Sequence, residues 1–125
     1  SFRQRIPIKT AKEIERMRTA GAIAGSILHE ISMAVKPGAT TGDIDALAAE
    51  LMRQNDCKSA FLGYRGFSGN ICISVNEEVV HGIGGPRRIL PGDIVSLDVG
   101  IVKGGFIGDN ATTVAVGDVP LETKR

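Results

Sequence analysis

Two aspartates near the end of this 125-residue sequence have the residue type and spacing for metal chemistry. Asp98 lies between Leu97 and Val99 in an apolar stretch, where an unpaired carboxylate is costly to bury. Asp109 lies in a second stretch that follows the pair Lys103-Gly104. The positions of these carboxylates relative to one another therefore decide what they do.

The segments 94–102 and 106–116 are predicted to be strands of one β-hairpin. Lys103-Gly104 is the predicted two-residue loop, because glycine supplies the positive φ that a primed turn needs. Counting back along both strands from this loop places Asp98 directly opposite Asp109, on the same face of the sheet. Their Cβ atoms are then expected about 4.5–5.5 Å apart.

Like charges in this arrangement repel, and two outcomes relieve the repulsion. One carboxylate keeps its proton, with its pKa raised by the other, or a divalent cation lies between them, for which Mg, Mn, Fe(II), Co or Zn is suited. The alternative is ordinary solvent-facing aspartates, since a one-residue bulge would place them on opposite faces. Two carboxylates also cannot complete a metal shell, so further ligands are expected.

A histidine and an aromatic cluster are the other candidate site residues. His81 follows Val79-Val80 and precedes a glycine-rich segment, a setting typical of catalytic residues and also of ordinary loop histidines. The segment FLGYRGF is equally compatible with a core-packing loop and with the rim of an apolar pocket that Cys72 would help to line. Its aromatic residues are Phe61, Tyr64 and Phe67.

The elements that must position these residues are predicted from hydrophobic period and capping. A helix is predicted over 10–35, with a capping box from Thr10 and Glu13. Thr40 or Thr41 begins a second helix that ends near 54–56, and short strands are predicted over 70–75 and 78–80. The fold class is therefore α+β, two helices packed on an antiparallel sheet. The apolar stripe of the first helix is Ile14, Met17, Gly21, Ala24, Leu28, Ile31 and Val35.

Composition excludes several classes of function. Lys and Arg number 15 against 14 Asp and Glu, so there is no basic excess for nucleic acid or anionic lipid. No apolar run is long enough to span a membrane, and the first residues lack the apolar stretch of a signal peptide. Cys57 and Cys72 have no zinc-type spacing, which favours free thiols in a cytoplasmic protein.

Longer motifs carry a family resemblance. NICISVNEEVVHGI, followed by LPGDIVSLDVGIVKGGFIGDNATTVAVG, resembles the N-terminal half of type I methionine aminopeptidases, and the likeness begins at IKTAKEIERMRTAG. It implies a pita-bread fold, of which residues 1–125 form the N-terminal half of the catalytic domain without the C-terminal half. It also implies two divalent metal ions (Co, Mn, Fe or Zn) with Asp98 and Asp109 as ligands. The remaining ligands, a histidine and two glutamates, belong to the half that this sequence lacks.

The resemblance also assigns roles to other residues. His81 is implied as a catalytic residue that contacts the scissile peptide and helps to stabilise the tetrahedral intermediate. A pocket for the methionine side chain and a monovalent cation site are implied as well. The pocket residues are Phe61, Tyr64, Phe67 and Cys72, with His81 also binding substrate, and the cation residues are Asn76 and Glu78.

The implied activity is removal of the initiator methionine from nascent chains, by attack of a metal-activated hydroxide on the first peptide bond. This chain alone is expected to be inactive, because the glutamate that acts as general base lies in the other half. Two alternatives remain: a catalytically inert pita-bread binding module, and a prolidase-like peptidase of the same fold. The sequence departs from the family pattern at Ser68 and Gly84, where proline is common.

Overall fold

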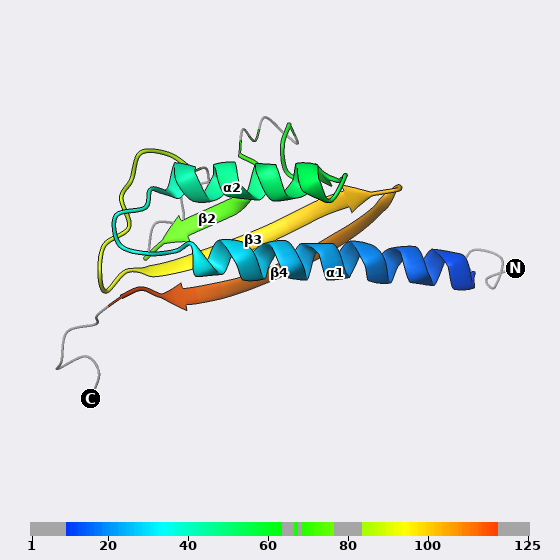
Figure 1. Ribbon diagram of the computed structural model, residues 1–125, viewed down its shortest axis with the longest axis horizontal. Coiled ribbons are helices and arrows are strands. Elements are labelled where there is room, and N and C mark those ends of the chain that lie inside the picture. The colour runs from blue at the N-terminus through cyan, green and yellow to red at the C-terminus, as the bar shows by residue number, and fades with distance from the viewer. Residues whose placement is uncertain (1–9, 64–66, 68, 77–83, 118–125) are drawn as a thin grey trace, which may run out of the picture.

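The computed structural model describes residues 10–63, 67, 69–76 and 84–117. The predicted strand over 78–80 lies outside this range, as do Tyr64, Glu78 and His81 among the predicted site residues. Two helices and a four-stranded antiparallel sheet form two layers (Figure 1). No helix in the described part of the chain is long and apolar enough to cross a membrane.

The first helix, α1 (Ala11–Met33), begins at the predicted capping box. The Thr10 hydroxyl accepts from the Glu13 N–H at 3.2 Å, and the Glu13 carboxylate accepts from the Thr10 N–H at 2.9 Å. The predicted apolar stripe of this helix is buried in its second half. In the first half the prediction is wrong, because Ile14 and Met17 are exposed. In Figure 1 the N-terminal end of α1 extends past the end of the sheet. The buried residues are Ala20, Ala24, Ile27, Leu28 and Ile31.

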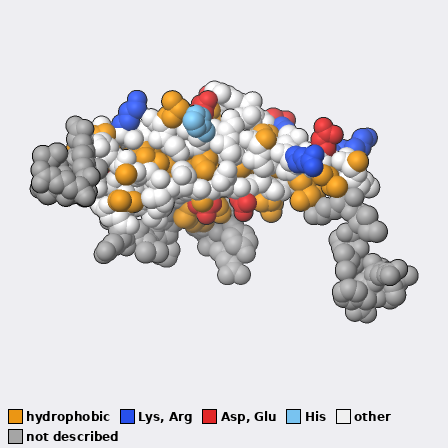
Figure 2. All heavy atoms as spheres, turned by 90° about the horizontal axis from the view of Figure 1, so that it is seen from below, with side chains coloured by type: hydrophobic (Ala, Val, Ile, Leu, Met, Phe, Trp, Pro, Cys, Tyr) orange, Lys and Arg blue, Asp and Glu red, His pale blue; other side chains and the backbone are white. Residues whose placement is uncertain are grey.

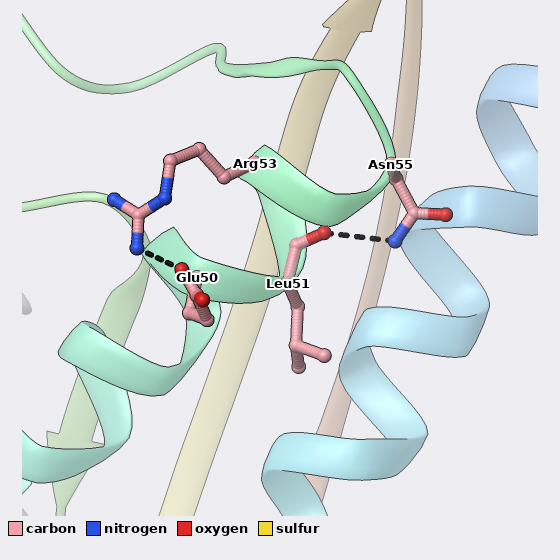
Figure 3. Close-up of polar contacts among 4 residues, drawn as sticks. All are labelled: Glu50, Leu51, Arg53 and Asn55. Atoms are coloured by element: carbon pink, nitrogen blue, oxygen red, sulfur yellow. Dashed lines mark hydrogen bonds and ion pairs between the residues drawn. The ribbon is translucent and has the colours of Figure 1, made fainter.

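The second helix, α2 (Thr41–Gln54), has a capping box of its own from Thr40 and Asp43. Hydrogen bonds from Thr40 to the Asp43 carboxylate hold the pKa of this carboxyl below its ordinary value. At the other end, the Asn55 side-chain amide donates to the Leu51 carbonyl at 2.8 Å, and Arg53 pairs with Glu50 (Figure 3). The helix therefore ends close to the predicted position.

The sheet is organised around one long strand. β3 (Ile94–Lys103) pairs with β4 (Phe106–Ala115) along one edge. Along its other edge it pairs with β1 (Lys58–Ser59) near one end and with β2 (Cys72–Val75) near the other. The two-residue β1 was not predicted, and β2 is shorter than the predicted strand over 70–75.

The two faces of the sheet differ sharply. The residues of β3 alternate between the helix-covered face, where they are buried, and the opposite face, where most are exposed. We call this opposite side the open face; it carries the even-numbered residues of β3 and the odd-numbered residues of β4. The core lies between the helices and the other face. Its largest fully buried side chains are Ile27, Ile31, Ile44, Ile71, Ile89, Leu97, Ile101, Val95, Val99 and Val116.

The hairpin register differs from the predicted one. The loop is Gly104-Gly105 rather than Lys103-Gly104, and Lys103 pairs with Phe106. Both loop residues have positive φ, 58° and 83°, as a primed turn requires at both central positions. A glycine pair adopts these angles without the steric cost that lysine would carry, so the loop falls one residue later.

Candidate metal-binding face

The corrected register moves the two aspartates from directly opposite to diagonal positions. Asp98 pairs with Ala111, and Asp109 pairs with Gly100. The partners shift by two positions, and side chains alternate with a period of two, so both carboxylates stay on the open face. Diagonal neighbours of this kind are separated by roughly 7–8 Å between Cα atoms, within reach of a bridging cation.

Electrostatics connects the two carboxylates. The pKa of Asp98 is raised above its ordinary value of 3.8, first because neighbouring atoms shield it from water and second because of the charge of Asp109. Cys72, directly opposite Asp98 in β2, also has a raised pKa, from burial and then from the Asp98 charge. Both shifts disfavour a further negative charge at this place on the open face.

A shallow hollow of about 400 Å³ lies beside Asp98 on the open face. Serine and threonine hydroxyls line it together with small apolar groups, so its floor is mixed in polarity. Its lining residues are Cys72, Ser74, Ser96, Leu97, Asp98, Ala111, Thr112 and Thr113. The hollow is broad and open to solvent, as expected of one wall of a site rather than a complete one.

An aromatic wall stands next to the carboxylates. The Phe61 and Phe67 rings are 5.9 Å apart between centroids and inclined by 60°. Phe61 lies over Gly100, the residue opposite Asp109. Phe61, Cys72 and both aspartates, predicted from widely separated segments, are thus brought to the open face.

Hydrogen bonds anchor the segments that lead into this region. Asp45 of α2 accepts from the Asn70 N–H at 2.8 Å and from the Ile71 N–H at 3.1 Å, which fixes the start of β2 against the helix. The Thr41 hydroxyl accepts from the Gly85 N–H at 2.8 Å. Two segments are therefore anchored to α2 by hydrogen bonds: the residues just before β2, and the segment that contains Gly85.

Asn76 lies apart from the aspartates, just past the end of β2. It has a left-handed backbone (φ 56°), its side-chain oxygen accepts from the Ile94 N–H at 2.9 Å, and its amide donates to Asp93 at 3.1 Å. Both polar atoms of its side chain therefore have protein partners. The monovalent-cation role of Asn76 and Glu78 stays a prediction.

Several residues that build this region were not predicted to matter. Gly100 carried a signal, because glycine inside a strand marks a close approach of another group. Ser59 and Asp45 carried none, since their partners lie more than ten residues away in sequence.

The donors present fit a divalent cation. Carboxylate oxygens suit Mg, Mn, Fe, Co and Zn, and both carboxylates lie on the open face. Within the described residues, no group of three or more His, Cys, Asp and Glu surrounds a metal position. Asp98 and Asp109 are the two carboxylates that the open face offers to a cation.

The described residues thus form an antiparallel sheet with helices on one face and a pair of carboxylates on the other. Residues 15–125 match the model of metallopeptidase family M24, and the chain belongs to this family. The resemblance identified from the motifs is therefore confirmed at the family level.

The relatives are methionine aminopeptidases. That of Clostridium acetobutylicum is 45% identical over 121 residues, which cover 96% of this chain and 48% of that protein. That of Escherichia coli is 43% identical over 122 residues, covering 96% of this chain and 46% of that protein. The chain thus spans about half the length of the curated relatives it matches.

Solved structures agree on the fold. The methionine aminopeptidase of Rickettsia prowazekii superposes with a TM-score of 0.86 at 38% identity, covering 96% of this chain and 48% of that one. The X-Pro aminopeptidase of Thermotoga maritima, at 21% identity and a TM-score of 0.71, shows the shared fold alone. The predicted α+β, pita-bread-type half is confirmed.

Proposed function

We propose that this chain is the N-terminal half of a methionine aminopeptidase that removes the first residue from newly made proteins. The observation that carries the proposal is the pair Asp98 and Asp109 on one face of the hairpin, beside an aromatic wall. A binding module has no need for two carboxylates that repel one another. The high identity to methionine aminopeptidases favours this specificity over a prolidase-like one.

In this proposal Asp98 and Asp109 hold two divalent ions, with Mn, Co, Fe and Zn as candidates. Such ions, when bound, lower the pKa of a water molecule and polarise a carbonyl group. The two carboxylates would hold the cations against the hairpin, and Phe61, Phe67 and Cys72 would provide an apolar surface for the methionine side chain. Tyr64 is proposed for the same surface, and His81 for hydrogen bonding to the scissile peptide.

The open face is the proposed docking surface for a second half. It leaves Ile94 and Ile107 exposed, with 47% and 66% of their surface accessible, on the same face as the carboxylates. A C-terminal half that covers it would complete the metal ligands and exclude water from the pocket. A cytoplasmic location, where nascent chains are made, belongs to the same proposal.

The test uses a two-half protein, in which this chain is continued by the C-terminal half of the Clostridium acetobutylicum relative. With Mn(II) or Co(II), we expect it to cleave a Met-Ala-Ser peptide, and the 125-residue chain alone to be inactive. Asp98→Asn and Asp109→Asn should each lower kcat/KM by about a hundredfold or more, since both act on the metal ions.

Asp56→Asn is the matched control for loss of one charge. Asp56 is exposed, lies at the end of α2, and has a left-handed backbone (φ 52°) that asparagine tolerates. It should keep full activity. A two-half protein that cleaves an Xaa-Pro peptide in preference to Met-Ala-Ser, or an Asp98→Asn variant with most of its activity, would overturn the proposal.

A further inference from the structure

The Phe61 ring of the aromatic wall packs directly against Gly100 of β3. A Cβ atom placed on Gly100 would lie 3.1 Å from Cζ and 3.4 Å from Cε2 of Phe61, and 3.4 Å from Cβ of Ala60. The first of these distances is closer than carbon atoms ordinarily approach. The Phe61 ring therefore occupies the space that a side chain at position 100 would fill.

Backbone and hydroxyl contacts hold the Phe61 segment in place. The Ala60 N–H donates to the Gly100 carbonyl at 2.8 Å, and the Ser59 hydroxyl donates to the Asn70 carbonyl at 2.6 Å. The same Ser59 oxygen accepts from the Phe61 N–H at 3.0 Å. Because these bonds hold the backbone, we expect a Cβ at position 100 to be accommodated by a shift of the Phe61 ring.

The second ring of the wall, Phe67, also packs against a glycine, Gly69. A Cβ on Gly69 would lie 3.1 Å from Cε2 and 3.4 Å from Cζ of Phe67. Phe61 and Phe67 contact one another, so displacement of one ring alters the packing of the other. Of the two glycines, Gly100 is the one next to the candidate site, because it pairs directly with Asp109.

We propose that Gly100 is a positioning residue for the substrate pocket: by lacking a side chain, it lets Phe61 lie against the sheet beside Asp109. The spacing between apolar wall and carboxylates then sets which side chain fits between them, a long unbranched one rather than a bulky one. This inference rests on the proposed function and adds to it a specificity determinant that contacts neither metal nor substrate.

The test is a double-mutant cycle in the two-half protein with Gly100→Ala, Phe61→Leu and both together. Gly100 has no positive φ, so alanine carries no backbone strain and acts through the ring. We expect Gly100→Ala to lower kcat/KM for Met-Ala-Ser by about tenfold, mainly through a higher KM. In the Phe61→Leu background, where the ring is absent, the same change should cost less than about threefold.

Gly21→Ala is the control glycine, because a Cβ there meets nothing within 4 Å; it should leave both constants unchanged. Mn(II) affinity, measured by calorimetry, should be the same in Gly100→Ala and in the original protein. Equal loss in both backgrounds, or a parallel loss of Mn(II) affinity, would show that Gly100 serves the sheet alone and would overturn the proposal.

An NMR measurement on the 125-residue chain separates this inference from the proposed function. A nuclear Overhauser effect between the Phe61 ring and the Gly100 Hα protons is expected, since the ring lies on this residue. Absence of this effect would show that the Phe61 ring does not pack on Gly100, whatever the activity of the two-half protein. Its presence in a chain whose two-half protein binds Mn(II) but cleaves no peptide would refute the proposed function and leave the packing of Phe61 on Gly100 intact.

Discussion

The two faces of the sheet contain the same strands and yet differ in almost every physical property. On the helix-covered face, β3 contributes residues such as Ile101, which is fully buried. On the open face, its neighbour strand contributes Ile107, which is 66% exposed, and both strands contribute a carboxylate. The helix-covered face therefore contributes most of the buried core, and the open face carries the candidate site residues.

The largest expected difference between the faces comes from one substitution made on each. Ile101→Ala should lower the free energy of unfolding by about 2–5 kcal/mol, because it removes buried methylenes and leaves a cavity. Ile107→Ala should change it by less than about 0.5 kcal/mol, because the side chain is mostly in water. Urea unfolding of the 125-residue chain measures both. Similar losses would mean that the open face is already covered in solution.

A glycine substitution tests how closely the helix approaches the sheet. A Cβ on Gly108 of β4 would overlap the Ala20 carbonyl of α1, whose oxygen would be 2.1 Å away. Gly108→Ala should therefore destabilise the chain by about 1–3 kcal/mol, since backbone has to move. Gly21→Ala, with open space around its Cβ, should be neutral or slightly stabilising in the same unfolding experiment.

A polar contact also stabilises the helix-covered side. Lys103, at the end of β3, donates from its ammonium group to the Asn55 carbonyl at 2.7 Å and to the Asp56 carbonyl at 3.2 Å. These are carbonyls at the C-terminal end of α2, where a cation is favourable. Lys103→Met should lower the unfolding free energy by about 1 kcal/mol. Lys58→Met, at an exposed position of β1, is the control that should change little.

On the open face, removing a charge should stabilise the metal-free chain. The folded pKa of Asp98 is raised above 3.8, so the folded state holds its proton more tightly than the unfolded state does. Its contribution to stability is present below pH 4 and is lost as the pH rises through the folded pKa. Asp98→Asn should remove this loss and stabilise the chain at pH 7 by at most about 1 kcal/mol. Destabilisation at pH 7 would contradict the cost that burial and the Asp109 charge place on ionised Asp98.

Both helices were predictable because their signals are local. A capping box spans four residues, and the stripe of buried residues in α2 follows from its own period. The exposure of Ile14 was not predictable, because the burial of a helix residue depends on which other elements pack against it. The hairpin was predicted with the wrong register, since both Lys103-Gly104 and Gly104-Gly105 resemble a primed turn. Only the second supplies glycine at both positive φ angles.

The candidate site was predicted in part for the same reason. Asp98 and Asp109 reach one face because the alternation of side chains is a property of the strands themselves. The packing of Phe61 on Gly100 joins residues 39 positions apart, and no local pattern contains it. The Asp45 contacts with the start of β2 are likewise non-local. The shared face of two residues in one hairpin can be predicted from sequence. Contacts between residues that are far apart in sequence become visible only in the folded structure.

The most direct test of the account is calorimetric titration of the 125-residue chain with Mn(II), with Asp98→Asn and Asp56→Asn as paired variants that lose the same charge. We predict weak binding by the original chain and by Asp56→Asn, because two carboxylates form only part of a metal shell. We predict no detectable binding by Asp98→Asn. Equal binding by all three proteins would contradict the claim that the aspartates of the open face form a divalent metal site.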